Sequence, residues 1–407
     1  MHPSTDESPE NMNEAKLPRR DWILLPLLGL LTICTLAGSL ELIASRVYTE
    51  SRPFIPACME PPGPEGRARA IPNHVCWDKK FESQWVEYRF NGCGHRAGME
   101  CAPKAPGTYR IVLIGSSIAM GNLVPREKTF AALLPVELTQ LTGRKIDLYN
   151  ESMEGTSPQV VAQRMNEVLA AKPDLILLAL TPFDIALETP HTGPPNAPIE
   201  SGSFLSNARL RIRTTLASES FLNAAHDLWE RGTEKFGETA SGALLLHVLN
   251  QSRSQYVKSS LSGRDAEFMR VPTGADWEDY LRQFDADSAE IVRQAKDADV
   301  PLVVTLVPAP AQAALISLGE WPKGFDPYKL NDHLRATITN QGEIYSDILP
   351  DYRGIANPER AYFLLDGHPN PEGHAIIARS LAKELTGGAI PALKAIPSQQ
   401  TVLERNR

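Results

Sequence analysis

The chain has 407 residues, of which 42% are hydrophobic, enough to bury the core of one large domain or of two modest ones. Its formal net charge is −8, which argues against a nucleic-acid partner, because phosphate binding needs clustered lysines and arginines. The sequence contains no internal repeats.

The first predicted element is a membrane anchor. Residues 1–21 are polar and are predicted to form a cytoplasmic tail, whereas residues 22–44 are apolar, with no charged side chain from Trp22 to Leu40. This uncharged run is close to the ~20 residues that cross the hydrocarbon core of a bilayer. Three basic residues before the run place the N-terminus in the cytoplasm by the positive-inside rule, and the rest of the chain outside, in the periplasm. They are Lys16, Arg19 and Arg20.

Two other interpretations of this segment are a buried core helix and a cleaved signal peptide. No amphipathic face supports a core helix. No A-x-A cleavage site follows cleanly, and Cys34 lacks the small preceding residue of a lipoprotein site. We therefore predict an uncleaved, single-pass anchor.

Residues 45–108 are rich in proline, glycine and cysteine and are predicted to form an irregular collar. An even number of cysteines in an exported segment suggests two disulfides, although four cysteines allow three pairings. Cys93 and Cys101 are eight residues apart around a glycine-rich turn, so we expect them to pair, leaving Cys58 with Cys76.

Zinc binding is the alternative use of these cysteines, because His74 and His95 lie among them. The spacing contains no C-x-x-C pair, which favours the disulfides. We expect no metal and no cofactor.

From residue 109 onward, buried strands alternate with helices, the pattern of a parallel sheet covered on both faces. We predict an α/β domain over residues 109–387, a three-layer sandwich with a central parallel sheet, followed by a polar tail over 388–407. The alternation stops at about residue 188, and a helical insertion is predicted over about 188–270. The predicted strands are 110–115, 145–150, 173–181 and 301–308. The predicted helices are 130–143, 157–172, 277–300 and 371–388.

Polar residues gather at the predicted carboxyl ends of these strands, where ligands bind in open α/β sheets. Three short stretches follow the first three strands, and a fourth precedes the last helix. They are Gly115-Ser116-Ser117, Glu154-Gly155-Thr156, Thr181-Pro182-Phe183-Asp184, and the loop with Asp366 and His368.

A serine hydroxyl becomes a nucleophile when a base takes its proton and an acceptor holds the base in the correct tautomer. His368 and Asp366 can supply both from one short loop, since residues i and i+2 of an extended chain point to the same side. Each element alone has an ordinary structural explanation, Ser117 as a helix cap and His368 as a loop histidine. Their order along the chain favours a catalytic site.

Four segments resemble the conserved blocks of the SGNH, or GDSL-type, esterases and acyltransferases, whose fold is flavodoxin-like. The resemblance covers about residues 109–187 and 285–385. The segments are RIVLIGSSIAMGNLVPREKTFAALL, DLYNESMEGTSP, KPDLILLALTPFDI and LLDGHPNPEGHAIIA.

The resemblance implies a role for several residues. Ser117 corresponds to the nucleophile of the first block, and its backbone N–H to an oxyanion donor. Gly155 corresponds to the glycine of the second block, another donor. Asp366 and His368 correspond to the acid and base of the last block.

Two positions depart from the family pattern. Ser116 stands where the family usually has aspartate, as in some membrane-anchored acyl-transfer members. Phe183 stands where an oxyanion-donating asparagine is usual, before Asp184, and phenylalanine cannot donate a hydrogen bond. Thr181 and Asn122 are candidate substitutes for the missing donor. Loss of one donor typically costs about 10²–10³ in rate.

Together with the predicted anchor, the resemblance implies a membrane-anchored, extracytoplasmic esterase that acts on acyl esters, in the first place acetyl esters of envelope glycans. The short D-x-H spacing resembles SGNH members that acetylate exported polysaccharides, so a polysaccharide O-acetyltransferase is the alternative. A second alternative is a non-catalytic envelope protein that binds a glycan or a membrane acyltransferase partner. The expected ligand is an acylated small molecule or glycan.

Overall fold

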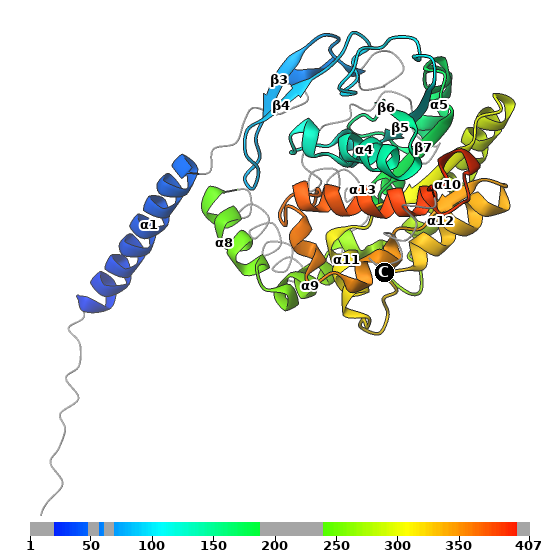
Figure 1. The fold of residues 1–407 in the computed structure, drawn as a ribbon. Helices are drawn as coiled ribbons and strands as arrows, with labels where there is room; N and C mark the ends of the chain where they lie inside the picture. Colours follow the sequence, from blue (N-terminus) through cyan, green and yellow to red (C-terminus); the bar gives the residue numbers. More distant parts are fainter. Residues whose placement is uncertain (1–19, 48–56, 61–68, 188–238, 397–407) are drawn as a thin grey trace, which may run out of the picture.

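The computed structural model describes residues 20–47, 57–60, 69–187 and 239–396 of the chain. A long helix, α1 (Asp21–Val47), extends away from a rounded α/β body, as Figure 1 shows. Of the predicted segments, most of the cytoplasmic tail, residues 188–238 of the insertion and the end of the polar tail lie outside the described residues.

A five-stranded sheet forms the centre of the body, with all strands parallel in the order β6-β5-β7-β8-β9. Its middle strand β7 reads LILLAL and is buried at every position, as expected for a sheet covered on both faces. The strands are β5 (Thr108–Gly115), β6 (Lys145–Asn150), β7 (Leu175–Leu180), β8 (Leu302–Leu306) and β9 (Ile344–Ser346).

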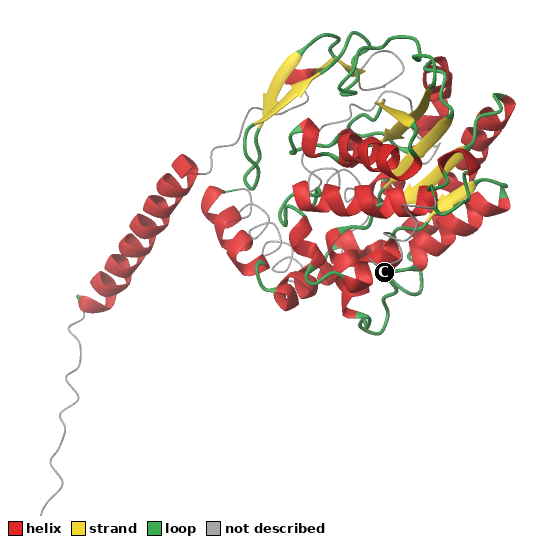
Figure 2. Ribbon diagram, in the orientation of Figure 1, coloured by secondary structure: helices red, strands yellow, loops and turns green. Residues whose placement is uncertain are grey.

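Helices cover both faces of this sheet, as Figure 2 shows in red around the yellow strands. On one face α4 (Phe130–Thr142) packs against α13 (Pro371–Thr386). On the other, α10 (Ala275–Asp297) packs against α5 (Pro158–Ala170) and α12 (Lys329–Asn340). The predicted three-layer α/β sandwich with a central parallel sheet is confirmed.

Local signals set several element boundaries. The Ser157 hydroxyl accepts a hydrogen bond from the Val160 N–H, and Pro158 opens α5, as the sequence predicts. Gly143 ends α4 with φ of 67°, a left-handed conformation that favours glycine. The edge strand β9 was not predicted, because its three residues are too few to show a strand period.

The described part of the insertion is helical. It contains α8 (Ala240–Asn250), α9 (Arg253–Ser262) and a 3₁₀ helix at Arg264–Met269, all before the cis bond between Val271 and Pro272. Helix α9 packs against α11 (Pro310–Leu318). This contact connects the insertion to the α/β body.

The collar segment forms two short antiparallel strand pairs where its composition predicted irregular structure. The pairs are β1 (Met59–Glu60) with β2 (Arg69–Ala70), and β3 (Val75–Asp78) with β4 (Val86–Arg89). Two disulfides, Cys58–Cys76 and Cys93–Cys101, confirm the predicted pairing. In the described residues no group of three or more His, Cys, Asp and Glu side chains is arranged to hold a metal ion.

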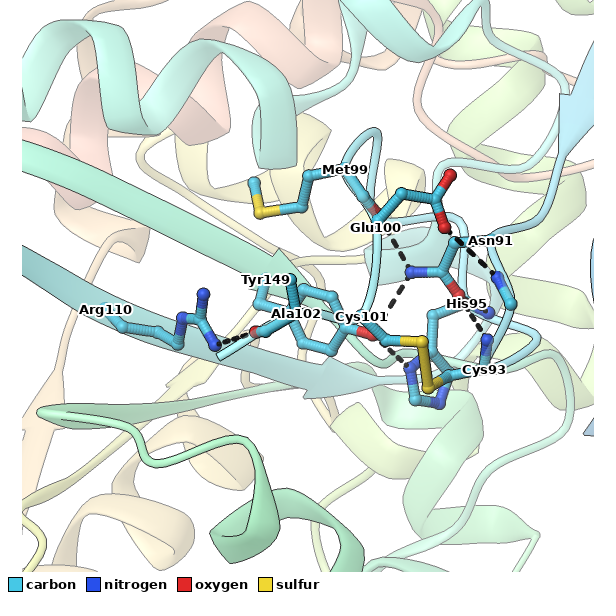
Figure 3. Close-up of a disulfide and its surroundings, with 10 residues drawn as sticks. Asn91, Cys93, His95, Met99, Glu100, Cys101, Ala102, Arg110 and Tyr149 are labelled. Carbon is cyan, nitrogen blue, oxygen red and sulfur yellow. Dashed lines mark hydrogen bonds between the residues drawn. A yellow bond between two sulfur atoms is a disulfide. The ribbon is translucent and has the colours of Figure 1, made fainter. Parts of the chain in front are cut away.

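The second disulfide loop is attached to the central sheet (Figure 3). The Asn91 amide donates to the Tyr149 hydroxyl of β6 at 3.1 Å and to the Met99 carbonyl at 2.9 Å. His95 contacts the same hydroxyl through Nδ1 at 3.2 Å. Burial first, then the nearby Arg164 and Arg69, lower the pKa of His95 to about 4, so this ring stays neutral and structural at neutral pH.

Helix α1 has the length and composition of a membrane span. The most apolar 18-residue window of its Asp21–Arg46 portion has a mean hydropathy of 2.2, and this window is not buried against the body. It is the one such helix among the residues that the structure describes. The apolar helix is therefore compatible with a single-pass anchor and also with a signal sequence.

Candidate active site

The turn after β5 carries the two adjacent serines. Gly115 ends the strand beside Ala179 of β7, and a Cβ at Gly115 would lie 2.4 Å from the Ala179 carbonyl oxygen, so only glycine fits. Ser116 is the N-cap residue and Ser117 opens the short helix α3 (Ser117–Met120). Since the chain leaves β5 toward β6 on one side and returns to β7 on the other, this turn lies at the switch point of the sheet.

Three of the predicted residues meet at this turn. The Ser117 Oγ lies 2.8 Å from His368 Nε2, and His368 Nδ1 is hydrogen-bonded to Asp366 Oδ1. The backbone N–H of His368 also donates to Asp366 Oδ1 at 3.3 Å, which fixes the carboxylate against its own loop. The Asp366 bond assigns the proton to Nδ1 and leaves the Nε2 lone pair facing the serine.

The charges of the site favour a basic histidine. Burial lowers the pKa of His368, but the carboxylates of Asp366, Glu154 and Asp184 outweigh it and leave this pKa above the ordinary value. Burial likewise acts to raise the pKa of Asp366, but its interactions with His368 and with Lys80 leave that pKa below its usual range. Asp366 is therefore an anion at neutral pH.

Ser116 has a different environment from Ser117. It is 3% exposed, whereas Ser117 is only partly buried. The Ser116 side chain hydrogen-bonds to Asp184, which is buried, and so points into the interior of the protein. Ser116 thus helps to hold the turn, and its hydroxyl does not contact His368.

Thr181 and Asp184 pair with each other at the start of α6 (Pro182–Ala186). The Asp184 carboxylate accepts the Thr181 N–H at 2.8 Å, and the Thr181 hydroxyl accepts the Asp184 N–H at 3.3 Å, a capping box. Burial raises the pKa of Asp184 to about 7 despite its hydrogen bonds. The Thr181 hydroxyl is an acceptor in this capping box and keeps its proton, so Thr181 remains a candidate donor to an oxyanion.

Asn122 and Glu154 form a second buried pair beside the nucleophile. Asn122 follows α3, with its N–H donating to the Ser117 carbonyl at 3.0 Å, and its side chain hydrogen-bonds to Glu154. Asn122 Oδ1 and Glu154 Oε2 are buried without a hydrogen-bond partner among the described residues. Burial raises the pKa of Glu154 against the opposing effect of His368. The sequence analysis placed Glu154 in the stretch after the second strand but gave its side chain no role.

Gly155 lies in the loop after β6, and this loop runs beside the turn that carries Ser117. The Met153 N–H donates to the Gly115 carbonyl at 3.1 Å and fixes this loop against the end of β5. Gly155 has φ of 70°, which favours glycine, and a Cβ there would meet nothing within 4 Å. The positive φ, and not a lack of space for a side chain, is therefore what favours glycine here.

The β3–β4 hairpin of the collar supplies residues that sequence reasoning missed. Glu82 Oε2 accepts the backbone N–H of Leu365 at 2.7 Å, directly before Asp366. Lys80 is close enough to lower the pKa of Asp366 by its charge. No motif signals these two residues, because they reach the site only through the folding of a distant segment.

Arg96 joins the collar to the loop that follows α3. Its guanidinium is 2% exposed, lies 4.2 Å from the ring centre of Tyr88 and donates to four backbone carbonyls. The acceptors belong to Met120, Gly121, Val124 and Glu87. The Tyr88 hydroxyl in turn accepts the Leu123 N–H at 2.7 Å. The collar thus fixes the backbone on both sides of Asn122.

The solved structures that resemble this chain include several esterases. A catalytic mutant of Axe2, an acetylxylan esterase from Geobacillus stearothermophilus, matches at 14% identity over 68% of this chain and 93% of its own, with a TM-score of 0.36. The psychrotrophic esterase EstA from Pseudoalteromonas sp. matches at 10% identity over 68% and 97%, also with a TM-score of 0.36. A protein assigned to the G-D-S-L lipolytic family, from Desulfitobacterium hafniense, matches at 13% identity over 67% and 99%, with a TM-score of 0.32.

No family model matches the sequence, and no curated protein matches it. The geometry of the site therefore carries the assignment of a function.

Proposed function

We propose that this protein is a membrane-anchored serine esterase that removes acyl groups, in the first place acetyl groups, from glycans outside the cytoplasm. The observation that carries the proposal is the chain of contacts from Ser117 Oγ to His368 Nε2 and from His368 Nδ1 to Asp366. These are the contacts that activate a serine toward an ester carbonyl.

The proposed reaction has two halves. Ser117 Oγ attacks the ester carbonyl carbon while His368 Nε2 takes the hydroxyl proton, and Asp366 stabilises the imidazolium that forms. His368 then returns the proton to the leaving alcohol oxygen, which breaks the ester and leaves an acyl-serine. Water, deprotonated by His368, attacks the acyl-serine and releases the acid and free Ser117.

The oxyanion of each tetrahedral intermediate needs hydrogen-bond donors. The proposed donors are the backbone N–H groups of Ser117 and Gly155. Ser117 is the first residue of α3, where an N–H has no acceptor inside the helix. Phe183 supplies no donor, so the site has a smaller set than the family pattern and we expect modest turnover.

The anchor is part of the proposal. Glu41 of α1 is hydrogen-bonded to helix α8, and Ala44 of α1 is 2% exposed. Cleavage after the apolar run would remove these contacts, which supports retention of α1. The position of the three basic residues before α1 supports an extracytoplasmic site.

An ester-directed fluorophosphonate tests the nucleophile. We expect one adduct on Ser117, found by mass spectrometry of the intact chain. Ser117→Ala should lose on the order of 10³–10⁶ in kcat on p-nitrophenyl acetate, His368→Ala nearly the same, and the double variant little more. An unlabelled Ser117 with no activity on any ester would instead favour the binding protein that Phe183 suggests.

The single residue between Asp366 and His368, the D-x-H spacing, favours one second candidate, an O-acetyltransferase. Both reactions share the acyl-serine, and a sugar hydroxyl replaces water in the second half. Incubation with an acetyl donor and an oligosaccharide separates the two: free acetate alone indicates an esterase, and acetylated oligosaccharide indicates a transferase.

A further inference from the structure

Helix α8 exposes its apolar side chains. Four of its eleven residues are large, apolar and between 37% and 58% exposed, and they cover one side of the helix. They are Leu245, Leu246, Val248 and Leu249. The helix contains no Asp, Glu, Lys or Arg. A contiguous patch of this kind is uncommon on a surface that faces only water.

The side of α8 that carries His247 faces the protein. His247 Nδ1 lies 2.7 Å from Glu82 Oε1, and its ring lies 6.1 Å from the ring of Phe81 in the β3–β4 hairpin. Ser241 and Gly242 are buried at the start of the helix. Ala243 and Leu244 are half-buried on this side as well, so α8 is apolar on both sides, whereas a surface helix of a soluble protein exposes a polar side.

The start of α8 is joined to α1. The Glu41 carboxylate accepts the N–H groups of Ala240 and Ser241 at 3.1 and 2.9 Å, and the Ser241 hydroxyl at 2.6 Å. Figure 1 shows α8 (green) beside the C-terminal end of α1 (blue). Because Glu41 directly follows the uncharged run that ends at Leu40, α8 begins at the level where the predicted membrane span ends.

The dimensions of α8 fit one position relative to a bilayer. Its eleven residues rise about 16 Å, about half the thickness of a hydrocarbon core, so it cannot cross a membrane. An apolar face without charges suits the boundary between headgroups and acyl chains. Trp85 lies in the loop of the β3–β4 hairpin, which contacts His247 of α8, and it is 53% exposed. Tryptophan is enriched at this boundary.

We propose that α8 is an interfacial helix that docks on the lipid bilayer beside α1, with Leu245, Val248 and Leu249 against the acyl chains. The inference rests on the proposed role of α1 as an anchor and adds a second contact with the same membrane. A single span leaves the body free to rotate and tilt. Two contacts fix the orientation of the body relative to the lipid surface.

The docked helix also sets the position of the catalytic loop. Glu82 binds His247 of α8 through Oε1 and the Leu365 N–H through Oε2, each at 2.7 Å. Leu365 directly precedes Asp366. The membrane surface, α8, the hairpin tip and the acid–base loop are therefore connected by direct contacts, and the site is held at a fixed height above the lipid.

Site-specific fluorescence on the full-length chain tests this proposal. The protein is reconstituted in vesicles of phosphatidylethanolamine and phosphatidylglycerol that contain nitroxide-labelled lipid. A fluorophore is attached to Val248→Cys in a Cys34→Ser background, since Cys34 is the free cysteine of the described residues. Val136→Cys is the matched control, because Val136 is 54% exposed on α4, away from α1 in Figure 1. The label on native Cys34 reports on the anchor alone.

We expect the Val248 label to lose about half of its emission to the lipid nitroxide and to resist aqueous iodide, because an interfacial helix buries its apolar face by ~5–10 Å. The Val136 label should show the opposite. Quenching at Cys34 without quenching at Val248 would overturn the docking of α8 and leave the anchor intact. Lack of lipid quenching at both would overturn both. Shielding of Val248 from lipid and from iodide would show that protein covers α8, and would also overturn the proposal.

Discussion

Ser116 and Ser117 are adjacent in the chain, but their side chains point to different partners and have different roles. Ser117 opens α3 and directs its hydroxyl to His368, whereas the Ser116 side chain turns inward and hydrogen-bonds to buried Asp184. The usual aspartate of this block would add a second carboxylate beside Asp184. A serine there avoids the repulsion between two buried anions.

We expect Ser116→Ala to retain activity. The substitution removes one hydrogen bond to Asp184, which is worth about 1 kcal/mol of folding stability, and leaves the contact between Ser117 and His368 in place. The checks are kcat/KM on p-nitrophenyl acetate and the midpoint of thermal unfolding. An inactive Ser116→Ala beside an active Ser117→Ala would reverse the assignment of the nucleophile.

Glu154 should influence the pH dependence of the reaction. Its carboxylate is one of the charges that raise the pKa of His368, and a protonated His368 cannot accept the serine proton. Removing that charge in Glu154→Gln lowers this pKa, so the acid limb of kcat/KM against pH should move to lower pH. Glu151→Gln is the matched control, because Glu151 is also buried but lies beside Arg164 and not beside His368. An unmoved limb in Glu154→Gln would remove Glu154 from the electrostatics of the site.

At the scale of elements, the β3–β4 hairpin acts as a support for the catalytic loop. Glu82 is the link, and its side chain is 6% exposed. Glu82→Ala leaves the Leu365 N–H without its acceptor and frees the loop that carries Asp366. Since small displacements of catalytic groups can cost up to about 10² in rate, we expect kcat to fall about 10–100-fold with KM nearly unchanged.

Glu82→Gln separates positioning from charge. The glutamine oxygen can still accept the Leu365 N–H, and its amide nitrogen can donate to His247 Nδ1. We expect activity close to that of the unsubstituted enzyme. Equal losses in the glutamine and alanine variants would contradict a positioning role.

Arg96 connects the collar to the loop after the nucleophile, and its replacement should destabilise both segments. Arg96→Met leaves four backbone carbonyls without this donor, three of them around Asn122. We expect a loss of about 3 kcal/mol or more in the free energy of unfolding, measured by urea denaturation. Arg96→Lys keeps the charge without the planar fork and should recover only part of the stability. Full stability in Arg96→Met would show that the collar folds independently of this contact.

At the scale of the whole molecule, the parts that the sequence predicted are those with local signals. Long apolar runs specified β5, β7 and β8, and Ser157 with Pro158 specified the start of α5. The roles of Glu82 and Glu154 were not predicted, for a physical reason. Their roles depend on partners brought close only by tertiary packing, 283 residues away along the chain in the case of Glu82 and Leu365.

The last prediction concerns the orientation of the whole chain in the membrane. With an uncleaved anchor and an N-terminus in the cytoplasm, alkaline phosphatase fused after Arg407 should be active, and a green fluorescent protein fused there should be dark. The intact mass should include the residues before α1, whereas a cleaved signal peptide would remove them together with the contact between Glu41 and α8. Replacing the three basic residues before α1 with glutamate should reduce the active phosphatase fraction, because the charge bias that sets the orientation is then reversed. A fluorescent C-terminal fusion in the unsubstituted chain would place the catalytic body in the cytoplasm, where its two disulfides would not be expected to persist.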